Sequence, residues 1–207
     1  MAESGTRRRL KKPQRRRLIE EAASALFAER GYAETRMDDI AAAAGVTKQL
    51  LYQHFHSKKA LHIALLERHR DGILDRLSEA MRTPGRLTDR FPLVLDAWFA
   101  YLEDNPYAAK LLFADTTGDP EVQAVYRDNH AAARTLTITL LKAEPELGIP
   151  DDRLEPLAEF IRSATTGLAL WWAEHPDVPR STVVEVTVGM LVRGLGVVPR
   201  TPTGPGS

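Results

Sequence analysis

Residues 17–61 read RLIEEAASALFAERGYAETRMDDIAAAAGVTKQLLYQHFHSKKAL, and this stretch decides the fold. It contains two short helical patterns joined by a turn at Gly45, where glycine tolerates a positive φ. The second pattern opens with polar residues from Thr47 and closes with Leu51, Tyr52 and Phe55. This order is typical of a helix-turn-helix, whose second helix is anchored in a core while its N-terminal end meets base edges of duplex DNA.

Helix-start and helix-end signals continue on both sides of this motif. A first helix begins near Gln14, carries an apolar face at i, i+3, i+4 spacing and ends at Gly31. Caps are expected before the next three helices at Thr35, Thr47 and Ser57. Asp38 stands where a capping-box partner of Thr35 would lie, and the fourth helix continues toward Met81.

Charge is distributed unevenly along the chain although the net charge is zero. Residues 1–61 hold 13 Lys+Arg against 7 Asp+Glu, whereas residues 62–207 hold 15 against 21. The N-terminal end can therefore neutralise DNA phosphates, and the acidic remainder is repelled by them. The basic run from Arg7 to Arg17 is interpreted as an arm that binds DNA by loose electrostatics more than by specific readout.

Composition limits the class of protein. A hydrophobic content of 43% over 207 residues is ample for a core, in one large domain or two small ones. The chain has no cysteine, which excludes disulfides and thiolate metal sites. No signal peptide and no apolar run long enough to span a membrane is recognised, so a cytoplasmic location is expected.

After the break at Thr83-Pro84-Gly85, the rest of the chain is predicted to be helical. The expected helices cover 87–104, 106–114, 119–143, 152–175 and 180–196. The β-branched stretch 183–188 favours a strand, but we predict helix because a lone strand would have no pairing partner. The predicted organisation is an arm at 1–13, a helix-turn-helix domain at 14–61, a helical body at 62–198 and a disordered tail at 199–207.

The motif residues resemble the DNA-binding domain of the TetR/AcrR transcriptional regulators. The resemblance is carried by Gly31-Tyr32, Thr35, Asp39-Ile40-Ala41, Ala44 to Thr47, Leu51-Tyr52, His54-Phe55 and Ser57-Lys58 to Leu61. One branch of the family is also resembled through Asn105-Pro106-Tyr107, Gly167 to Trp172 and His175-Pro176. The resemblance implies an all-α homodimer with a four-helix interface formed by the last two helices, and a small-molecule pocket in the body. Gln49 and Lys59 depart from the residues that the family commonly has there.

Ten residues are predicted to meet DNA: Thr35, Arg36, Thr47, Lys48, Gln49, Leu50, Tyr52, His54, Lys58 and Lys59. Lysine can donate to guanine or to phosphate, and glutamine can pair bidentately with adenine. The alternative for the trio at the helix start is a solvated surface without a partner. Tyr52 is one helical step away from the better core candidates Leu51 and Phe55, so its hydroxyl is expected on the phosphate backbone with His54.

The body supplies candidates for a ligand pocket and for a dimer interface. The pocket candidates are Trp98, Phe113, Tyr126, His130, Phe160 and Thr165, for most of which an ordinary core position is the alternative. The interface candidates are Leu168, Trp172, Val184, Val188, Leu191 and Leu195. No metal site is predicted, because no carboxylate or cysteine joins the histidines at ligand spacing, and no cofactor is predicted.

These patterns predict a repressor that leaves a palindromic operator when a small, mainly apolar ligand biases the fourth helix. Two alternatives stay open. A constitutive or architectural DNA-binding protein would have a filled body without a cavity. An enzyme with an incidental helix-turn-helix would need converging titratable groups, and the sequence offers no such constellation.

Overall fold

The computed structural model describes residues 11–85, 87–114 and 118–196, and within them it contains α-helices and one 3-10 turn but no β-strand. The elements are α1 Lys12–Glu34, α2 Met37–Ala43, α3 Lys48–His54, α4 Lys58–Met81, α5 Leu87–Asp104, α6 Ala108–Phe113, α7 Pro120–Lys142, η1 Pro145–Leu147, α8 Asp151–Ala173 and α9 Arg180–Gly196. The predicted all-α class is confirmed, and 183–188 is helical. The arm expected at 1–13 and the tail at 199–207 fall mostly outside the described residues, and α1 already begins at Lys12.

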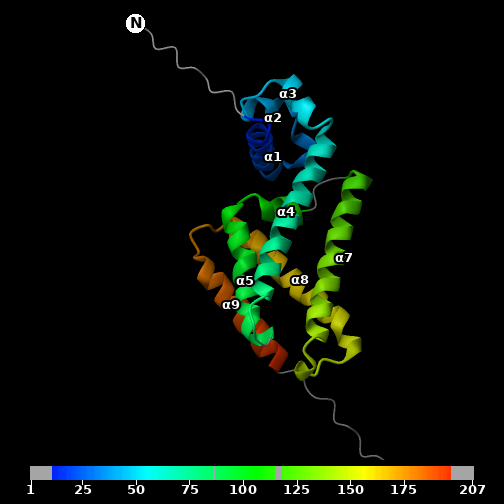
Figure 1. Cartoon of the computed structure of the whole chain (residues 1–207), viewed down its shortest axis with the longest axis vertical. Helices are drawn as coiled ribbons and strands as arrows, with labels where there is room; N and C mark the ends of the chain where they lie inside the picture. The colour runs from blue at the N-terminus through cyan, green and yellow to red at the C-terminus, as the bar shows by residue number, and fades with distance from the viewer. Residues whose placement is uncertain (1–10, 86, 115–117, 197–207) are drawn as a thin grey trace, which may run out of the picture.

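The first three helices lie at one end of the molecule (Figure 1), where they share a small core with the first turns of α4 and with Leu111 of α6. Ile19, Ile40 and Leu51, one from each helix, have no solvent exposure. Gly31 interrupts α1 with a φ of 79°, and Gly45 turns the chain between α2 and α3 with a φ of 63°. Both glycines therefore occupy conformations that other residues rarely adopt, as the sequence predicted for these positions.

Helix α4 joins the two halves of the protein. Ser57 caps it by accepting a hydrogen bond from the Ala60 amide at 3.0 Å. Its first turns, through Leu65, pack into the N-terminal core, and from Leu66 onward its buried residues belong to the core of the body. The domain boundary predicted after residue 61 thus lies inside one continuous helix.

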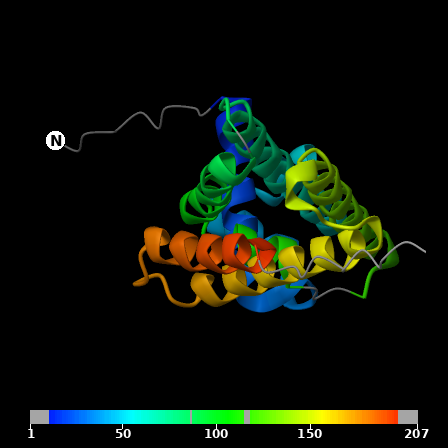
Figure 2. The ribbon, with the colours of Figure 1, turned by 90° about the horizontal axis from the view of Figure 1, so that it is seen from below.

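The body consists of α4 to α9. Seen along the molecule, α4 with α5, α7, and the pair α8–α9 form its three sides (Figure 2). Helix α5 lies very close to α4 at Gly72. A Cβ added to Gly72 would be only 2.6 Å from the Cε2 atom of Tyr101, so this position has no room for a side chain. The Tyr101 hydroxyl lies 2.9 Å from His69 Nδ1, so a polar contact is buried at this crossing.

A local signal also predicted the start of α7. The Asp119 carboxylate accepts hydrogen bonds from the Glu121 and Val122 amides at 2.9 and 3.3 Å and caps α7. Helix α9 buries Val183, Thr187 and Leu191 at i, i+4, i+8 spacing, which is the periodicity of a helix. No helix in the described part of the chain has the length and apolarity needed to cross a bilayer.

Candidate DNA-binding surface and ligand cavity

Helix α3 is anchored by one face and exposed by the other. Leu51 and Phe55 are buried, and the Thr47 hydroxyl caps the helix by accepting from the Leu50 amide at 3.2 Å. Lys48 and Gln49 are exposed at its first turn, and Tyr52 is 43% exposed on the same outer surface. The structure therefore brings Lys48, Gln49 and Tyr52 of the predicted DNA-contact set together on one surface, and it assigns the core role to Leu51 and Phe55.

Lys48 is bound by a neighbouring helix. Its ammonium lies 2.8 and 3.1 Å from the two carboxylate oxygens of Asp38, in the first turn of α2. The hydrogen bond and charge of Asp38 raise the pKa of Lys48. Arg36, just before α2, is exposed. Exposed ion pairs are weak, so a phosphate or a base can replace Asp38 as the partner of Lys48.

Thr35 does not cap α2, so that prediction is wrong. Arg36 occupies the cap position, and the Thr35 hydroxyl instead donates to the carbonyl oxygens of Gly31 and Leu26 at 2.8 and 3.2 Å. Only 1% of Thr35 is exposed. A hydroxyl buried between two turns of α1 cannot reach a phosphate, so Thr35 is removed from the DNA-contact set.

Lys58 holds the end of α1. Its ammonium donates to the carbonyl oxygens of Tyr32, Ala33 and Thr35 at 2.7, 3.1 and 2.9 Å, and it lies 4.4 Å from the centre of the Tyr32 ring. An ammonium has three donors, and all three are engaged here. The predicted phosphate contact of Lys58 is therefore corrected to a structural role.

Lys59 also has a partner inside the protein. Its ammonium lies 2.5 Å from the Glu121 carboxylate and 3.8 Å from that of Asp119, at the start of α7. These acidic groups raise the pKa of Lys59. The residue that the sequence assigned to a phosphate thus connects the first turn of α4 to α7.

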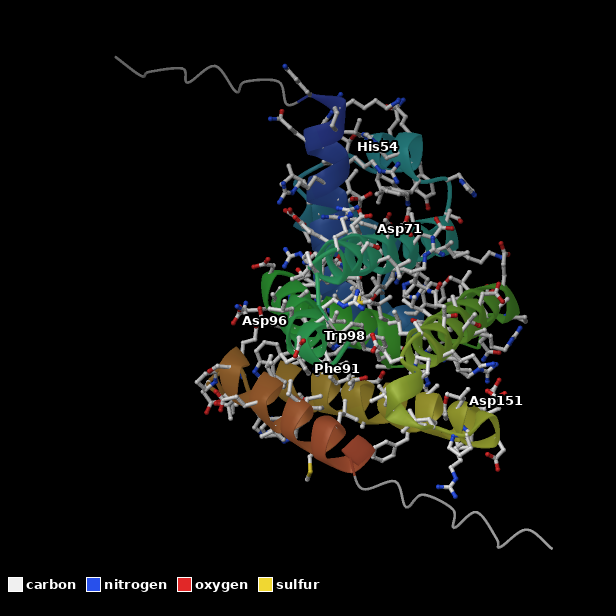
Figure 3. All side chains as sticks on the ribbon, turned by 60° about the horizontal axis from the view of Figure 1, so that its bottom comes forward. His54, Asp71, Phe91, Asp96, Trp98 and Asp151 are labelled. Atoms are coloured by element: carbon white, nitrogen blue, oxygen red, sulfur yellow. The ribbon has the colours of Figure 1, made fainter. Side chains whose placement is uncertain are left out.

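His54 lies half-buried near the start of α1 (Figure 3). Burial, followed by the positive charges of Lys12, Arg15 and Arg16, lowers its pKa below 6.5. The imidazole is consequently neutral near pH 7 and can offer a phosphate one N–H donor but no charge. Leu50, beside it in the predicted set, is half-buried.

A cavity of about 410 Å³ opens inside the body. It is lined by one face of α4 and by parts of α5, α6, α7 and α8. Four of the six predicted pocket residues contribute to the lining: Trp98, Phe113, His130 and Thr165. The Trp98 and Phe113 rings pack 5.4 Å apart at its wall, and Figure 3 shows Trp98 and Phe91 in the middle of the body. A volume of this size lies in the range of small-molecule sites.

Two predicted pocket residues lie elsewhere. Tyr126 is buried between the two halves of the protein, where its hydroxyl donates to the Leu111 carbonyl at 2.6 Å and lies 3.4 Å from His62 Nε2. Phe160 is 62% exposed on the outside of α8. Helical spacing predicts only that these residues lie on apolar helix faces. Whether such a face meets the core, the cavity or solvent depends on how its helix packs.

The sequence missed the contribution of α4 to the cavity. One face of this helix, at i, i+3, i+4, i+7, i+11 spacing, lines it with Arg70, Ile73, Leu74, Leu77 and Met81. The spacing itself was visible in the sequence and indicated a buried face. Nothing in the spacing, however, distinguishes a face that packs against protein from one that borders a void.

The predicted dimer residues mostly pack inside their own subunit. Trp172 and Leu191 are buried in two separate clusters, and Leu168, Val184 and Val188 pack against those clusters. The side chain of Leu195 lies outside the described residues. The exposed apolar residues of α8 and α9 are instead Phe160, Trp171, Val186 and Met190, the last with 73% exposure. The sequence pointed to α8 and α9, which do expose apolar residues, but the predicted interface residues lie mostly on the inward faces of these helices.

Comparison with known proteins finds similarity along nearly the whole chain. Residues 19–65 match the family described as bacterial regulatory proteins, tetR family. The transcriptional activator FasR of Mycolicibacterium smegmatis is 32% identical over 201 residues, covering 95% of this chain and 91% of the relative. The transcriptional repressor KstR2 of Mycobacterium tuberculosis is 27% identical over 187 residues, covering 87% and 92%.

Solved structures show the same fold. The ketosteroid transcriptional regulator KstR2 of Mycobacterium tuberculosis superimposes with a TM-score of 0.71 at 26% identity, over 93% of this chain and 98% of that one. FadR of Bacillus subtilis, solved in complex with stearoyl-CoA, superimposes with a TM-score of 0.74 at 18% identity, over 86% and 98%. The second likeness concerns the fold alone.

Proposed function

This chain belongs to the tetR family of bacterial transcriptional regulators, and from that premise we propose that it binds a palindromic operator as a homodimer and is released by a mainly apolar small molecule. The observation that carries the proposal is the position of the cavity. It borders α4, and the first turns of that same helix are part of the DNA-binding core.

The DNA-binding part of the proposal rests on the outer surface of α3. Gln49 and Lys48 are exposed at the N-terminal turn, where a recognition helix meets base edges. We assign base readout to these two residues and phosphate contact to Tyr52, with Thr47, Arg36 and the neutral His54 at the edge of the surface. Lys58 has no part in this set, because three carbonyl oxygens engage its ammonium. Lys59, whose ion pair with Glu121 is exposed like that of Lys48 with Asp38, stays a candidate for phosphate contact.

The part of the proposal that concerns the dimer rests on the exposed apolar residues of α8 and α9. Phe160 and Trp171 are three helical turns apart on α8, and Val186 and Met190 are one turn apart on α9. Exposed apolar residues in such an arrangement mark an interaction surface. We propose that a second copy of the same face buries all four residues; binding to successive major grooves requires the two α3 helices of that dimer to lie about 34 Å apart.

The part of the proposal that concerns the ligand rests on the composition of the cavity wall, which consists mainly of leucine, isoleucine, valine and aromatic side chains. The structure of FadR with stearoyl-CoA and the name of the ketosteroid regulator KstR2 offer long apolar groups as the first compounds to test. Because α4 borders the cavity and enters the DNA-binding core, a ligand that favours another position of α4 changes the distance between the two recognition helices.

The bound protein has two candidate effects on transcription, repression and activation. A protein that lowers transcription while it is bound to the operator is a repressor, as KstR2 is named. The relative with the higher identity, FasR, is named an activator, which favours a second candidate in which this protein stimulates transcription when bound. Transcription in vitro from a promoter that contains the selected operator separates the two, since added protein lowers transcript in one case and raises it in the other.

The test begins with selection of bound sites from random duplexes, followed by fluorescence anisotropy with the selected site. We expect a palindrome, and we expect stearoyl-CoA or a steroid-like compound to weaken binding. Leu136→Trp, which fills the cavity, should retain DNA affinity and lose the response. Thr135→Trp is the matched control, because Thr135 is exposed like Leu136 on the same helix but lies outside the cavity lining. A non-palindromic site, or an equal response in Leu136→Trp, contradicts the proposal.

A further inference from the structure

The polar groups of the cavity are concentrated toward one end of the α4 face. Arg70 begins that face and Met81 ends it, eleven residues later, which corresponds to about 16 Å along the helix axis. Between them the face presents Ile73, Leu74 and Leu77. Asn129 approaches Arg70 from α7, whereas Leu140 lines the cavity three turns further along α7. The α4 side of the cavity therefore has a polar end and an apolar end, while Thr137, Arg162 and Thr165 are polar lining residues of α7 and α8.

Several polar side chains in the lining already have partners. The Thr137 hydroxyl donates to the Ala133 carbonyl at 3.0 Å, and the Thr165 hydroxyl donates to the Ile161 carbonyl at 2.8 Å. Arg162 is held by Glu159 through two of its nitrogen atoms. The two threonine hydroxyls therefore stabilise α7 and α8 themselves. Arg162 is engaged by Glu159 through two nitrogen atoms just as Arg70 is by Asp71, so only a direct comparison of the two arginines separates them.

Arg70 and Asn129 are differently placed. Arg70 binds the exposed Asp71 through Nε and Nη2 at 2.9 and 2.8 Å, and its Nη1 donates to Asn129 Oδ1 across 3.4 Å, which is long for a hydrogen bond. Figure 3 shows Asp71 between the DNA-binding helices and the centre of the body. A guanidinium can only donate, so it fixes the Asn129 oxygen toward Arg70. The Asn129 Nδ2 group is left buried and without an acceptor among the described residues.

We infer that the cavity binds a chain-like apolar molecule with anionic oxygens at one end, its anionic group held by Arg70 and Asn129 and its chain extending toward Met81 and Leu140. This inference deepens the proposed function and rests on it. An anionic oxygen accepts from Arg70 Nη1 and from Asn129 Nδ2 at once, while Asp71 keeps the other two Arg70 nitrogens. This replaces a long contact and satisfies a buried donor. Both the carboxylate of a free fatty acid and the phosphates of its coenzyme A ester have this chemistry.

The first experiment measures binding of laurate, lauroyl-CoA and dodecanol by calorimetry to the wild-type protein, Arg70→Gln and Arg162→Gln. Loss of one charged hydrogen-bonding partner should weaken the anionic compounds about 10- to 100-fold in Arg70→Gln and leave dodecanol nearly unchanged. Arg162→Gln, which also lines the cavity, should bind all three like wild type. Weaker binding in Arg162→Gln but not in Arg70→Gln overturns the assignment, as does equal weakening of dodecanol.

The preference between laurate and lauroyl-CoA identifies the source of the anion. Asn129→Asp provides a second variant of nearly the same shape, in which the new carboxylate should repel both anionic compounds and spare dodecanol. Undiminished laurate and lauroyl-CoA binding by Asn129→Asp contradicts the inference. Failure of the proposed function looks different: the compounds would bind with this dependence on Arg70 yet leave operator affinity unchanged.

The second experiment tests the direction of the chain. Leu140→Trp narrows the apolar end and should weaken palmitate more than octanoate, because only the longer chain reaches that end. Equal weakening of the two acids, or selective weakening of octanoate, contradicts the proposed direction and places the anionic group away from Arg70.

Discussion

Replacing Lys58 by methionine should destabilise the DNA-binding domain and leave its electrostatic attraction to DNA unchanged. The ammonium binds the carbonyl oxygens of Tyr32, Ala33 and Thr35 at 2.7 to 3.1 Å, which closes the end of α1 against the start of α4. Burial lowers the pKa of Lys58, which shows that the charged group has lost part of its hydration here. The contacts are therefore made where water has been partly removed.

The magnitude follows from these three bonds. A hydrogen bond to a charged group contributes about 1.5–3 kcal/mol, but the carbonyl groups are only partly buried and water can replace the ammonium at some of them. Methionine also keeps most of the apolar stem in place over the Tyr32 ring. We therefore expect a loss of about 2–4 kcal/mol in the free energy of unfolding, measured by urea denaturation.

The control is Lys48→Met, on the exposed surface of α3. Its ion pair with Asp38 is exposed, so the urea concentration at the midpoint of unfolding should hardly change. If Lys48 neutralises a phosphate, the log–log salt slope of binding to random duplex should become shallower by about one unit per subunit. The reasoning is refuted if Lys58→Met unfolds at the same urea concentration as wild type while its salt slope becomes shallower.

Three further outcomes are expected. Met190→Glu should give monomers in sedimentation without loss of helix, whereas Leu191→Glu should unfold the body because Leu191 is buried; a persistent Met190→Glu dimer would place the interface elsewhere. Burial lowers the pKa of His62 and of His69 from 6.5 to about 4, so the unfolded chain binds more protons between these values, and stability should fall as pH falls through this window by about 3 kcal/mol per histidine. His62→Leu removes one of the two histidines and should therefore remove about half of that loss; the variant should stay folded because the Tyr126 hydroxyl keeps its bond to Leu111. An unchanged pH dependence would contradict this. Gln49→Ala should relax one base position per half-site at a cost of about 1–3 kcal/mol, and an unaltered selected site would show that Gln49 does not read a base.

The helices, and the starts of α3, α4 and α7, could be predicted because their signals are local. Thr47, Ser57 and Asp119 each accept from an amide two or three residues ahead, so a short stretch of sequence contains both partners. The helical assignment of 183–188 required one further step, the recognition that a strand there would have nothing to pair with. The turn at Gly45 could be predicted for the same reason, because the positive φ is a property of that one residue.

The partners of Lys58 and Lys59 could not be predicted in this way. Lys58 bonds to carbonyl groups 23 to 26 residues away, and Lys59 pairs with the start of α7, which only the packing of the halves brings near. A lysine that follows a recognition helix has the same sequence signature whether it meets phosphate or carbonyl oxygen. Distance along the chain conceals the difference.

Local sequence is sufficient to specify which segments are helices and which polar turn of α3 is left free. The rotation of each body helix, in contrast, is specified by its tertiary contacts. Trp171 and Trp172 are neighbours on α8, yet the first is exposed and the second is buried, and Met190 and Leu191 differ in the same way on α9. A helix with apolar residues on more than one side has no preferred inward face until its neighbours cover one. Core, cavity wall and interaction surface are therefore assigned by packing, even when the residues that form them are adjacent in the chain.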